Sequence, residues 1–165
     1  SDGSIWFPNC YDDFLIRPLN IAKTNLIGFC GMINNRGGLI QHLQENFKFT
    51  LDEFVIGDAM VNAINSYKVH FNANISIDIN YRNFESIGCG TCLLTSHNQH
   101  LKSLGFKDSE NCLIYDSLEQ MVDKTREVLN NEDKRRSIEQ KGLELAQQHT
   151  YKERIKTIIK LYKGE

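Results

Sequence analysis

Short apolar runs alternate with helical patterns over most of the chain. The first run, Leu26–Cys30, predicts a buried strand that ends at Gly31. A turn is expected at Asn34–Gly38, because asparagines and glycines gather there. Apolar residues then recur at helical spacing, which predicts a helix after the turn. These residues are Leu39, Ile40, Leu43 and Phe47.

The same alternation continues to about position 115. Further strands are expected at Phe54–Ile56, Lys68–Asn72, Thr91–Thr95 and Cys112–Tyr115. Helical segments are expected between them, at about 59–65, 82–88 and 99–104. Short strands that alternate with helices predict an α/β fold in which a parallel sheet of about five strands carries helices on both faces.

The remainder of the chain reads as helical. Ser117 with Gln120 forms a capping-box pattern that begins one helix, and a second is expected at about 132–147. A third, at about 151–162, places Ile155, Ile158, Ile159 and Tyr162 on one side. We expect this stripe to cover the core, with the basic residues on the solvated outer side. Contact of those basic residues with an anionic membrane surface is the alternative.

Residues 1–24 hold both prolines and little periodicity, so we interpret them as a connecting arm before a domain at 25–165. The length of 165 residues suits one domain or a piece of a larger protein. Because the sequence begins with Ser1, we expect a processed product or a fragment.

Composition narrows the class of protein. Hydrophobic content of 41% and charged content of 24% are ordinary for a globular protein. The net charge of -2 gives no reason to expect nucleic-acid binding. No apolar run approaches the roughly 20 residues of a transmembrane helix. The five cysteines are odd in number and irregularly spaced, which favours reduced thiols in a cytoplasmic protein.

The glycine-rich corner Gly31–Gly38 is the first candidate for ligand binding. Glycines after a first strand let the backbone approach a ligand, and the following helix start offers free N–H donors. Arg36 could reach a diphosphate there, beside Gly31 and Gly37. The spacing is neither the dinucleotide fingerprint nor a P-loop. A plain turn with a solvated arginine remains the competing interpretation.

The segment Tyr81–Thr95 is the second candidate. Arg82 and Glu85 lie three residues apart on the first turn of a predicted helix. At this point of an α/β domain an arginine can clamp phosphate and a carboxylate can hold ribose hydroxyls. The alternative is a surface ion pair, and Glu85 also suits the positive end of the helix dipole.

Cys89 and Cys92 resemble a thioredoxin-type pair, but they end a helix instead of beginning one, which is the wrong polarity for thiolate activation. Buried structural thiols are the better interpretation. No Cys or His pair at matching spacing completes a metal site. His97 and His100 follow the fourth predicted strand and could line a ligand cleft.

Several ordered motifs together resemble a known family. They are W-F-P-N-C-Y-D-D, L-I-G-F-C-G, Y-K-V-H-F-N, R-N-F-E-S-I-G-C-G-T-C-L-L-T, E-N-C-L-I-Y-D-S-L-E-Q-M-V-D-K, and His149-Thr150-Tyr151 followed by Arg154. The order is similar to the C-terminal half of GT-B glycosyltransferases of group one, specifically the CgeB-like (spore maturation protein) branch. The resemblance covers nearly the whole chain.

This resemblance implies a Rossmann-like domain that binds a nucleotide-diphosphate sugar as substrate, without a cofactor or a metal. Arg36 would contact the diphosphate, Arg82 would lie near the phosphates, and Glu85 would match the second glutamate of the E-x7-E pattern, which holds the donor ribose. Ile77 stands where the fuller pattern has its first glutamate. Positioning of the donor sugar therefore departs from the family pattern.

The resemblance also implies a partner. A GT-B active site lies between two such domains, and the N-terminal one is absent from this sequence. We therefore expect a donor-binding domain of a glycosyltransferase that is inactive alone. Two other hypotheses remain: a non-catalytic interaction module that keeps the fold, and a thiol oxidoreductase built on Cys89 and Cys92.

Overall fold

A single parallel sheet organises the fold. The computed structural model describes residues 5–164. Its five strands lie in the order β2-β1-β3-β4-β5, and every neighbouring pair is parallel. The strands are β1 (Asn25–Cys30), β2 (Phe49–Asp52), β3 (Tyr67–Asn72), β4 (Cys92–Ser96) and β5 (Leu113–Tyr115). The predicted α/β sheet is confirmed.

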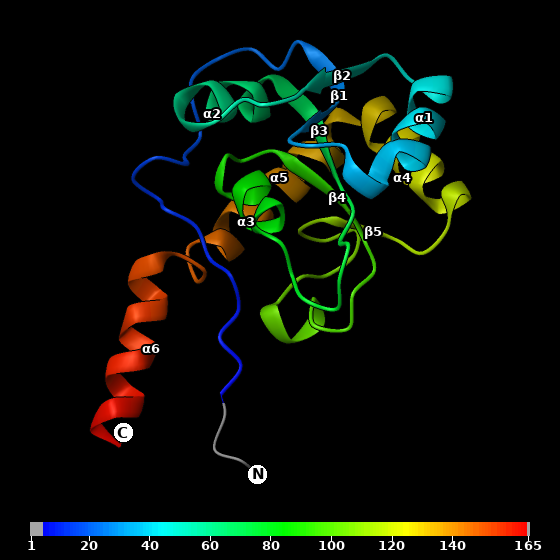
Figure 1. Cartoon of the computed structure of the whole chain (residues 1–165). Helices are drawn as coiled ribbons and strands as arrows, with labels where there is room; N and C mark the ends of the chain where they lie inside the picture. Colours follow the sequence, from blue (N-terminus) through cyan, green and yellow to red (C-terminus); the bar gives the residue numbers. More distant parts are fainter. Residues whose placement is uncertain (1–4, 165) are drawn as a thin grey trace.

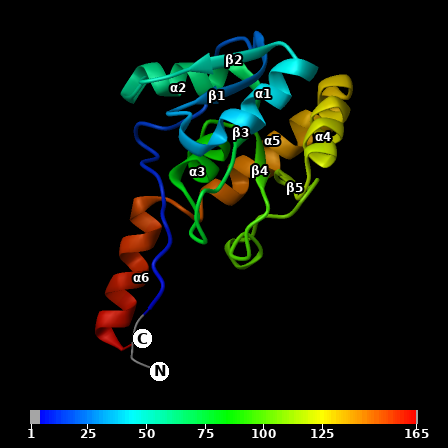
Figure 2. The same cartoon turned by 45° about the vertical axis from the view of Figure 1, so that its right-hand side comes forward.

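Helices cover both faces of this sheet (Figures 1 and 2). They are α1 (Gly37–Asn46), α2 (Gly57–Ser66), α3 (Tyr81–Gly88), α4 (Leu118–Asn130), α5 (Glu132–Ala146) and α6 (Tyr151–Lys163), with 3-10 turns at η1 (Asn34–Arg36) and η2 (Lys102–Leu104). One core cluster joins α1 and α4 to the sheet, and the other joins α2, α3 and the end of α5. The result is the expected three-layer arrangement.

The predicted position of the second strand is wrong. Phe54–Ile56 lies in the loop between β2 and α2, and the strand is Phe49–Asp52 instead. Phe54 has a left-handed backbone (φ +60°), and its side chain is 79% exposed. An exposed residue with positive φ cannot continue a strand ladder. β2 pairs only with β1, so it is an edge strand whose residues are all half-buried.

The N-terminal arm packs against the domain. Tyr11 and Ile16 are buried in the core, and the Tyr11 ring lies against Gly88, where an added Cβ would stand 2.7 Å from the ring. Tyr11 also exchanges backbone hydrogen bonds with His149 and Tyr151. Part of the predicted connecting arm therefore contributes to the fold, while residues 1–4 lie outside the described chain.

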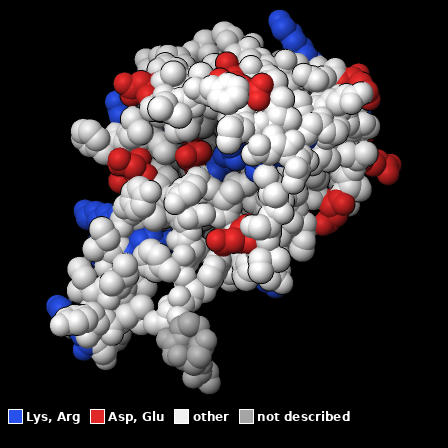
Figure 3. All heavy atoms as spheres, viewed as in Figure 1, with Lys and Arg blue, Asp and Glu red and all other residues white. Residues whose placement is uncertain are grey.

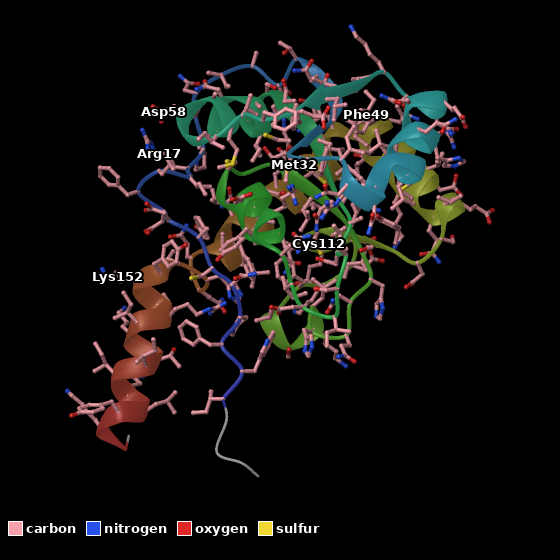
Figure 4. All side chains as sticks on the ribbon, in the orientation of Figure 1. Arg17, Met32, Phe49, Asp58, Cys112 and Lys152 are labelled. Carbon is pink, nitrogen blue, oxygen red and sulfur yellow. The ribbon has the colours of Figure 1, made fainter. Side chains whose placement is uncertain are left out.

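The last helix does not cover the core, which corrects the expectation for its apolar stripe. α6 buries no residue and extends away from the sheet beside the arm (Figures 1 and 2). Ile155, Ile158 and Ile159 are each about half exposed, and Tyr162 is 91% exposed. Lys152 at its start projects far from the sheet (Figure 4). Arg154 ties the helix to the arm by donating to the carbonyls of Pro8 and Asn9.

All five cysteines are buried and unpaired, so the interpretation of Cys89 and Cys92 as buried thiols is confirmed. Cys89 follows the last turn of α3, and Cys92 begins β4. Burial raises the pKa of both thiols to about 12. A thiolate nucleophile is therefore disfavoured at this corner. The cytoplasmic location that the reduced thiols suggest stays a prediction.

Helix α5 packs closely on its neighbours at Gly142, which yields a stability prediction. A Cβ there would lie 2.8 Å from the Asn111 carbonyl oxygen and 3.2 Å from Cγ2 of Ile87. Gly142→Ala should therefore lower the free energy of unfolding by about 1–3 kcal/mol, because overpacking outweighs the better helix propensity of alanine. Gly38→Ala in α1 is the matched control, since nothing lies within 4 Å of its added Cβ. Urea unfolding of both variants measures this. Equal stability of Gly142→Ala and wild type would contradict the described packing.

Burial of the thiols yields a second prediction. A pKa near 12 in place of 9.0 leaves Cys89 and Cys92 with about a thousandfold less thiolate than an ordinary cysteine at mildly alkaline pH. The native protein should therefore react very slowly with a chromogenic disulfide, and the unfolded protein should react at all five cysteines. Rapid modification of either residue in the native protein would revive the oxidoreductase hypothesis.

Candidate functional site

A cavity of about 480 Å³ opens at the carboxyl end of β1, beside the start of the helix that follows β3. The order in which strands are added to the sheet reverses at β1. The chain first adds β2 on one side of β1, and it then crosses to add β3 on the other side. In open α/β sheets such a switch point leaves a crevice in which ligands bind. The cavity lies between the end of β1, the β2–α2 loop and the first turns of α3. In Figure 3, acidic and basic atoms lie beside each other in a hollow on this face.

Arg82 forms one wall of this cavity. Its Nε donates to the Cys30 carbonyl at 2.9 Å, and its guanidinium carbon lies 5.0 Å from the centre of the Phe29 ring. Gly31 makes room for it, because a Cβ there would lie 2.2 Å from an Arg82 nitrogen. Gly31 also has φ +140°, which favours glycine. Burial lowers the pKa of Arg82, and nearby Glu85 opposes that shift.

Glu85 lies one turn further along α3 and faces the same cavity. Among residues 5–164 its carboxylate has neither a hydrogen bond nor an ion pair within 4.0 Å, although every fully buried side-chain nitrogen or oxygen of that part has a partner. The carboxylate oxygens therefore reach the cavity surface. Burial raises the pKa of Glu85, and Arg82 opposes that shift. The pair does not form the surface ion pair that its spacing allows.

The start of α3 is held by a network of buried and half-buried amide side chains. Asn80 donates to the side chain of Asn72 at 3.0 Å and to the Ala73 carbonyl at 3.3 Å. Asn83 receives a hydrogen bond from Thr95 at 2.8 Å and donates to Asn74 at 2.8 Å. These contacts join α3 to the ends of β3 and β4. The position of Arg82 and Glu85 is therefore set by the sheet as well as by their helix.

Arg36 lies behind this cavity and not within it. Only 3% of Arg36 is exposed, and its Nε donates to the Ala73 carbonyl at 3.1 Å. It opens on a second hollow of about 200 Å³, which shares Asn80 with the first. Its guanidinium carbon is 5.7 Å from the Phe29 ring, which Arg82 also contacts. Burial lowers the pKa of Arg36, and the charge of Arg82 lowers it further.

The structure therefore brings three of the five predicted residues together. Gly31, Arg82 and Glu85 line one cavity, and Arg36 lines the adjoining hollow. Gly37 begins α1 and lines neither. Ile77, at the position of the missing glutamate, is 78% exposed in the loop before α3. The contact of these residues with a ligand stays a prediction.

An apolar wall from the β2–α2 loop was not predicted as part of a site. Phe54 and Ile56 of this loop and Met60 of α2 line the cavity, together with Met32, which lies near the centre of Figure 4. Phe54 and Ile56 are 79% and 82% exposed. A Phe-Val-Ile run followed by glycine looks like a strand, so its apolar character concealed its role. Positive φ at Phe54 is the kind of backbone strain that gathers at binding sites.

The two histidines expected near a cleft lie apart from this cavity. His97 is exposed, with Nδ1 3.8 Å from Asp116. The His100 ring lies against Trp6 of the arm, with 4.6 Å between ring centres and the ring planes tilted by 30°. Within residues 5–164 no three His, Cys, Asp or Glu side chains lie close enough together to hold a metal ion. No helix in that range is both long and apolar enough to cross a membrane.

Comparison with known proteins identifies the family of this chain. The profile of a family described as glycosyl transferase-like matches residues 15–160. No curated protein matches the sequence. HepE from Anabaena, solved in complex with UDP, superposes with a TM-score of 0.78 at 8% identity, over 94% of this chain and 56% of that chain. Sucrose-phosphate synthase from Thermosynechococcus elongatus gives 0.73 at 12% identity, over 96% and 51%.

A third structure matches in size as well as in shape. The C-terminal domain of LpcC, a glycosyl transferase group 1 family protein from Francisella tularensis, has a TM-score of 0.67 at 11% identity, over 83% of this chain and 96% of that one. The chain thus spans about half of HepE and of the synthase, but nearly all of an isolated C-terminal domain. At these identities the likeness concerns the fold. With the match of the family profile, the conclusion is that the chain belongs to the glycosyl transferase-like family and has the Rossmann-like fold of GT-B C-terminal domains.

Proposed function

We propose that the chain is the donor-binding domain of a glycosyltransferase, which binds a nucleotide-diphosphate sugar in the cavity beside β1 and α3. One observation carries the proposal. Arg82 and the unpaired carboxylate of Glu85 face a single cavity at the switch point of the sheet. HepE, which shares the fold, was solved with UDP, with UDP-glucose, and with UDP and glucose.

The cavity offers a chemically suitable surface for each part of a nucleotide. The Arg82 guanidinium and the first turn of α3 suit the diphosphate, since arginine and helix N-termini both bind phosphate. Glu85 suits the ribose hydroxyls as a hydrogen-bond acceptor. The exposed Phe54 and Ile56 provide an apolar surface for the base. During transfer, Arg82 and Arg36 would stabilise the diphosphate leaving group, a task for which preorganised cations suffice.

A second domain would supply the acceptor side. The chain spans about half of HepE and of sucrose-phosphate synthase but 96% of the LpcC C-terminal domain, which supports this part of the proposal. The half-exposed apolar stripe of α6 would be available to such a domain, and the arm beside α6 carries the exposed Trp6 and Phe7 (Figure 1). We therefore infer that an N-terminal domain packs on α6, and that the isolated chain binds donor without transferring it.

A non-catalytic module remains the second candidate, and Ile77 is the observation that favours it. An exposed isoleucine cannot accept a hydrogen bond from a donor sugar, whereas the carboxylate in the family pattern can. Such a module would bind a partner while nucleotides leave it unaffected. Nucleotide binding therefore separates the two candidates.

We expect calorimetric titration with UDP, GDP or ADP, or their sugars, to reveal one preferred nucleotide with Kd between about 1 µM and 1 mM. Glu85→Gln and Arg82→Lys should each weaken that binding about tenfold or more, because each removes a charged or forked hydrogen-bonding group. Glu119→Gln and Arg126→Lys on the outer side of α4 are the matched controls and should leave Kd unchanged. Weakening in Arg36→Lys as well would indicate phosphate between the two arginines.

Absence of any saturable signal from a folded protein would refute donor binding by this chain. Binding that survives both Glu85→Gln and Arg82→Lys would place the nucleotide elsewhere.

Hydrogen exchange tests the second domain. In the natural polypeptide, backbone amides of α6 should exchange at least about tenfold more slowly than in residues 1–165 alone, because a packed domain would bury the stripe. Amides of α1, which lies on the other side of the sheet, should be unchanged. Equal exchange of α6 in both samples would exclude the contact. Protection only with anionic vesicles would favour the membrane surface instead.

A further inference from the structure

His70 is fully buried in the middle of β3, directly behind the candidate site. It does not line the cavity, so it cannot touch a ligand there. Its two ring nitrogens nevertheless contact both elements that carry Arg82 and Gly31. Nε2 lies 3.2 Å from the backbone nitrogen of Cys30 at the end of β1, and Nδ1 lies 2.7 Å from the hydroxyl oxygen of Ser86 in α3.

The chemistry of the partners determines where the imidazole proton lies. The Cys30 backbone N–H can only donate, so Nε2 of His70 accepts and carries no proton. Ser86 uses its single proton to donate to the Arg82 carbonyl at 2.6 Å. Its oxygen must therefore accept from His70, which places the proton on Nδ1. No other protonation state of the ring satisfies all of these contacts.

Arg82 closes these contacts into a ring. Its Nε donates to the carbonyl of Cys30, the same residue whose N–H donates to His70. Ser86 holds the backbone of Arg82, and Cys30 holds its side chain. A closed ring of four hydrogen bonds, two of them made by the buried imidazole, thus joins β3, β1 and α3. Burial, with the charges of Arg82 and Lys23, lowers the pKa of His70 to about 3, which keeps the ring neutral.

We propose that His70 is a positioning residue of the donor site: as a neutral Nδ1–H imidazole it fixes the Arg82 guanidinium against Gly31 at the cavity wall. A guanidinium preorganised in this way loses little conformational freedom when an anion binds. The His70 imidazole therefore raises the affinity for a nucleoside diphosphate without touching it. This role in binding rests on the proposed function, whereas the fixing of Arg82 can be tested in the free protein.

His149 is a natural control for a buried histidine without such a role. It lies at the junction of α5 and α6, where Nδ1 is 2.8 Å from a guanidinium nitrogen of Arg154 and Nε2 is 2.7 Å from the Leu104 carbonyl. Arginine can only donate and a carbonyl can only accept, so His149 carries its proton on Nε2. The two buried histidines are therefore expected in opposite tautomers, and His149 makes no side-chain hydrogen bond to a residue that lines the cavity.

The first experiment reads the tautomers by long-range proton–nitrogen NMR of the free protein. We expect His70 in the Nδ1–H form and His149 in the Nε2–H form, both unchanged from mildly acidic to mildly alkaline pH. A His70 signal in the Nε2–H form, or one that titrates near the ordinary pKa of about 6.5, would contradict the hydrogen bonds assigned to His70.

The second experiment measures exchange of the Arg82 Nε–H in the free protein and the Kd of the preferred nucleoside diphosphate. His70→Gln and Ser86→Ala both break the link to α3, so each should speed exchange and weaken binding by about tenfold, the range of one or two hydrogen bonds. The double variant should show the same exchange rate and the same Kd as either single variant, because both substitutions remove the same hydrogen bond between His70 and Ser86. His149→Gln should change both readouts much less than His70→Gln, because its side chain makes no hydrogen bond to Cys30, Arg82 or Ser86.

Each outcome decides between distinct possibilities. Wild-type protein that binds no nucleotide refutes the donor site, yet the exchange of Arg82 still tests the ring. Additive effects of His70→Gln and Ser86→Ala, or equal effects of His149→Gln, would reduce His70 to an ordinary core residue. If His70→Gln does not fold, Ser86→Ala supplies the same comparison with only one hydroxyl removed.

Discussion

The reversal of strand order at β1 and β3 is the constraint on which the candidate site depends. Parallel strands need crossover connections, and these are almost always right-handed. A right-handed crossover from β1 to its neighbour on one side puts α1 on one face, and the return to β3 puts α2 on the other. The chain that leaves β3 continues into α3 on the same face as α2, so the connections that leave β1 and β3 diverge just where these two strands end. The opening beside Gly31 is therefore a property of the topology, and the side chains around it decide what it can hold.

Those side chains leave the region short of negative charge. Arg82 and Arg36 both lie against the Phe29 ring, and each donates to a backbone carbonyl instead of a carboxylate. Glu85 is the one carboxylate that lines the cavity. Buried cations are costly unless paired, and backbone carbonyls meet that cost only in part. Under the proposed function, a bound diphosphate would supply the missing negative charge beside these two arginines.

Much of the fold could be predicted from the sequence because its elements are signalled locally. The capping residue Ser117 and the apolar run before Gly31 each act within a few positions. The failures needed information from far along the chain. Whether Phe49 or Phe54 belongs to β2 depends on which of them pairs with β1, and a half-buried edge strand has a weak apolar signal.

The site divides in the same way. Arg82 and Glu85 are one helical turn apart, so their shared orientation was predictable. Arg36 has the right chemistry, but its engagement with Ala73 depends on a partner 37 positions away. The amphipathic pattern of α6 identified an apolar face without indicating what covers it.

The contact of the Tyr11 ring with Gly88 has a mechanical consequence, because α3 ends there and carries Arg82 and Glu85 on its earlier turns. The arm, which Arg154 of α6 holds by two hydrogen bonds, therefore packs against the end of α3, so a shift of α6 would be passed on to the helix that carries Arg82 and Glu85.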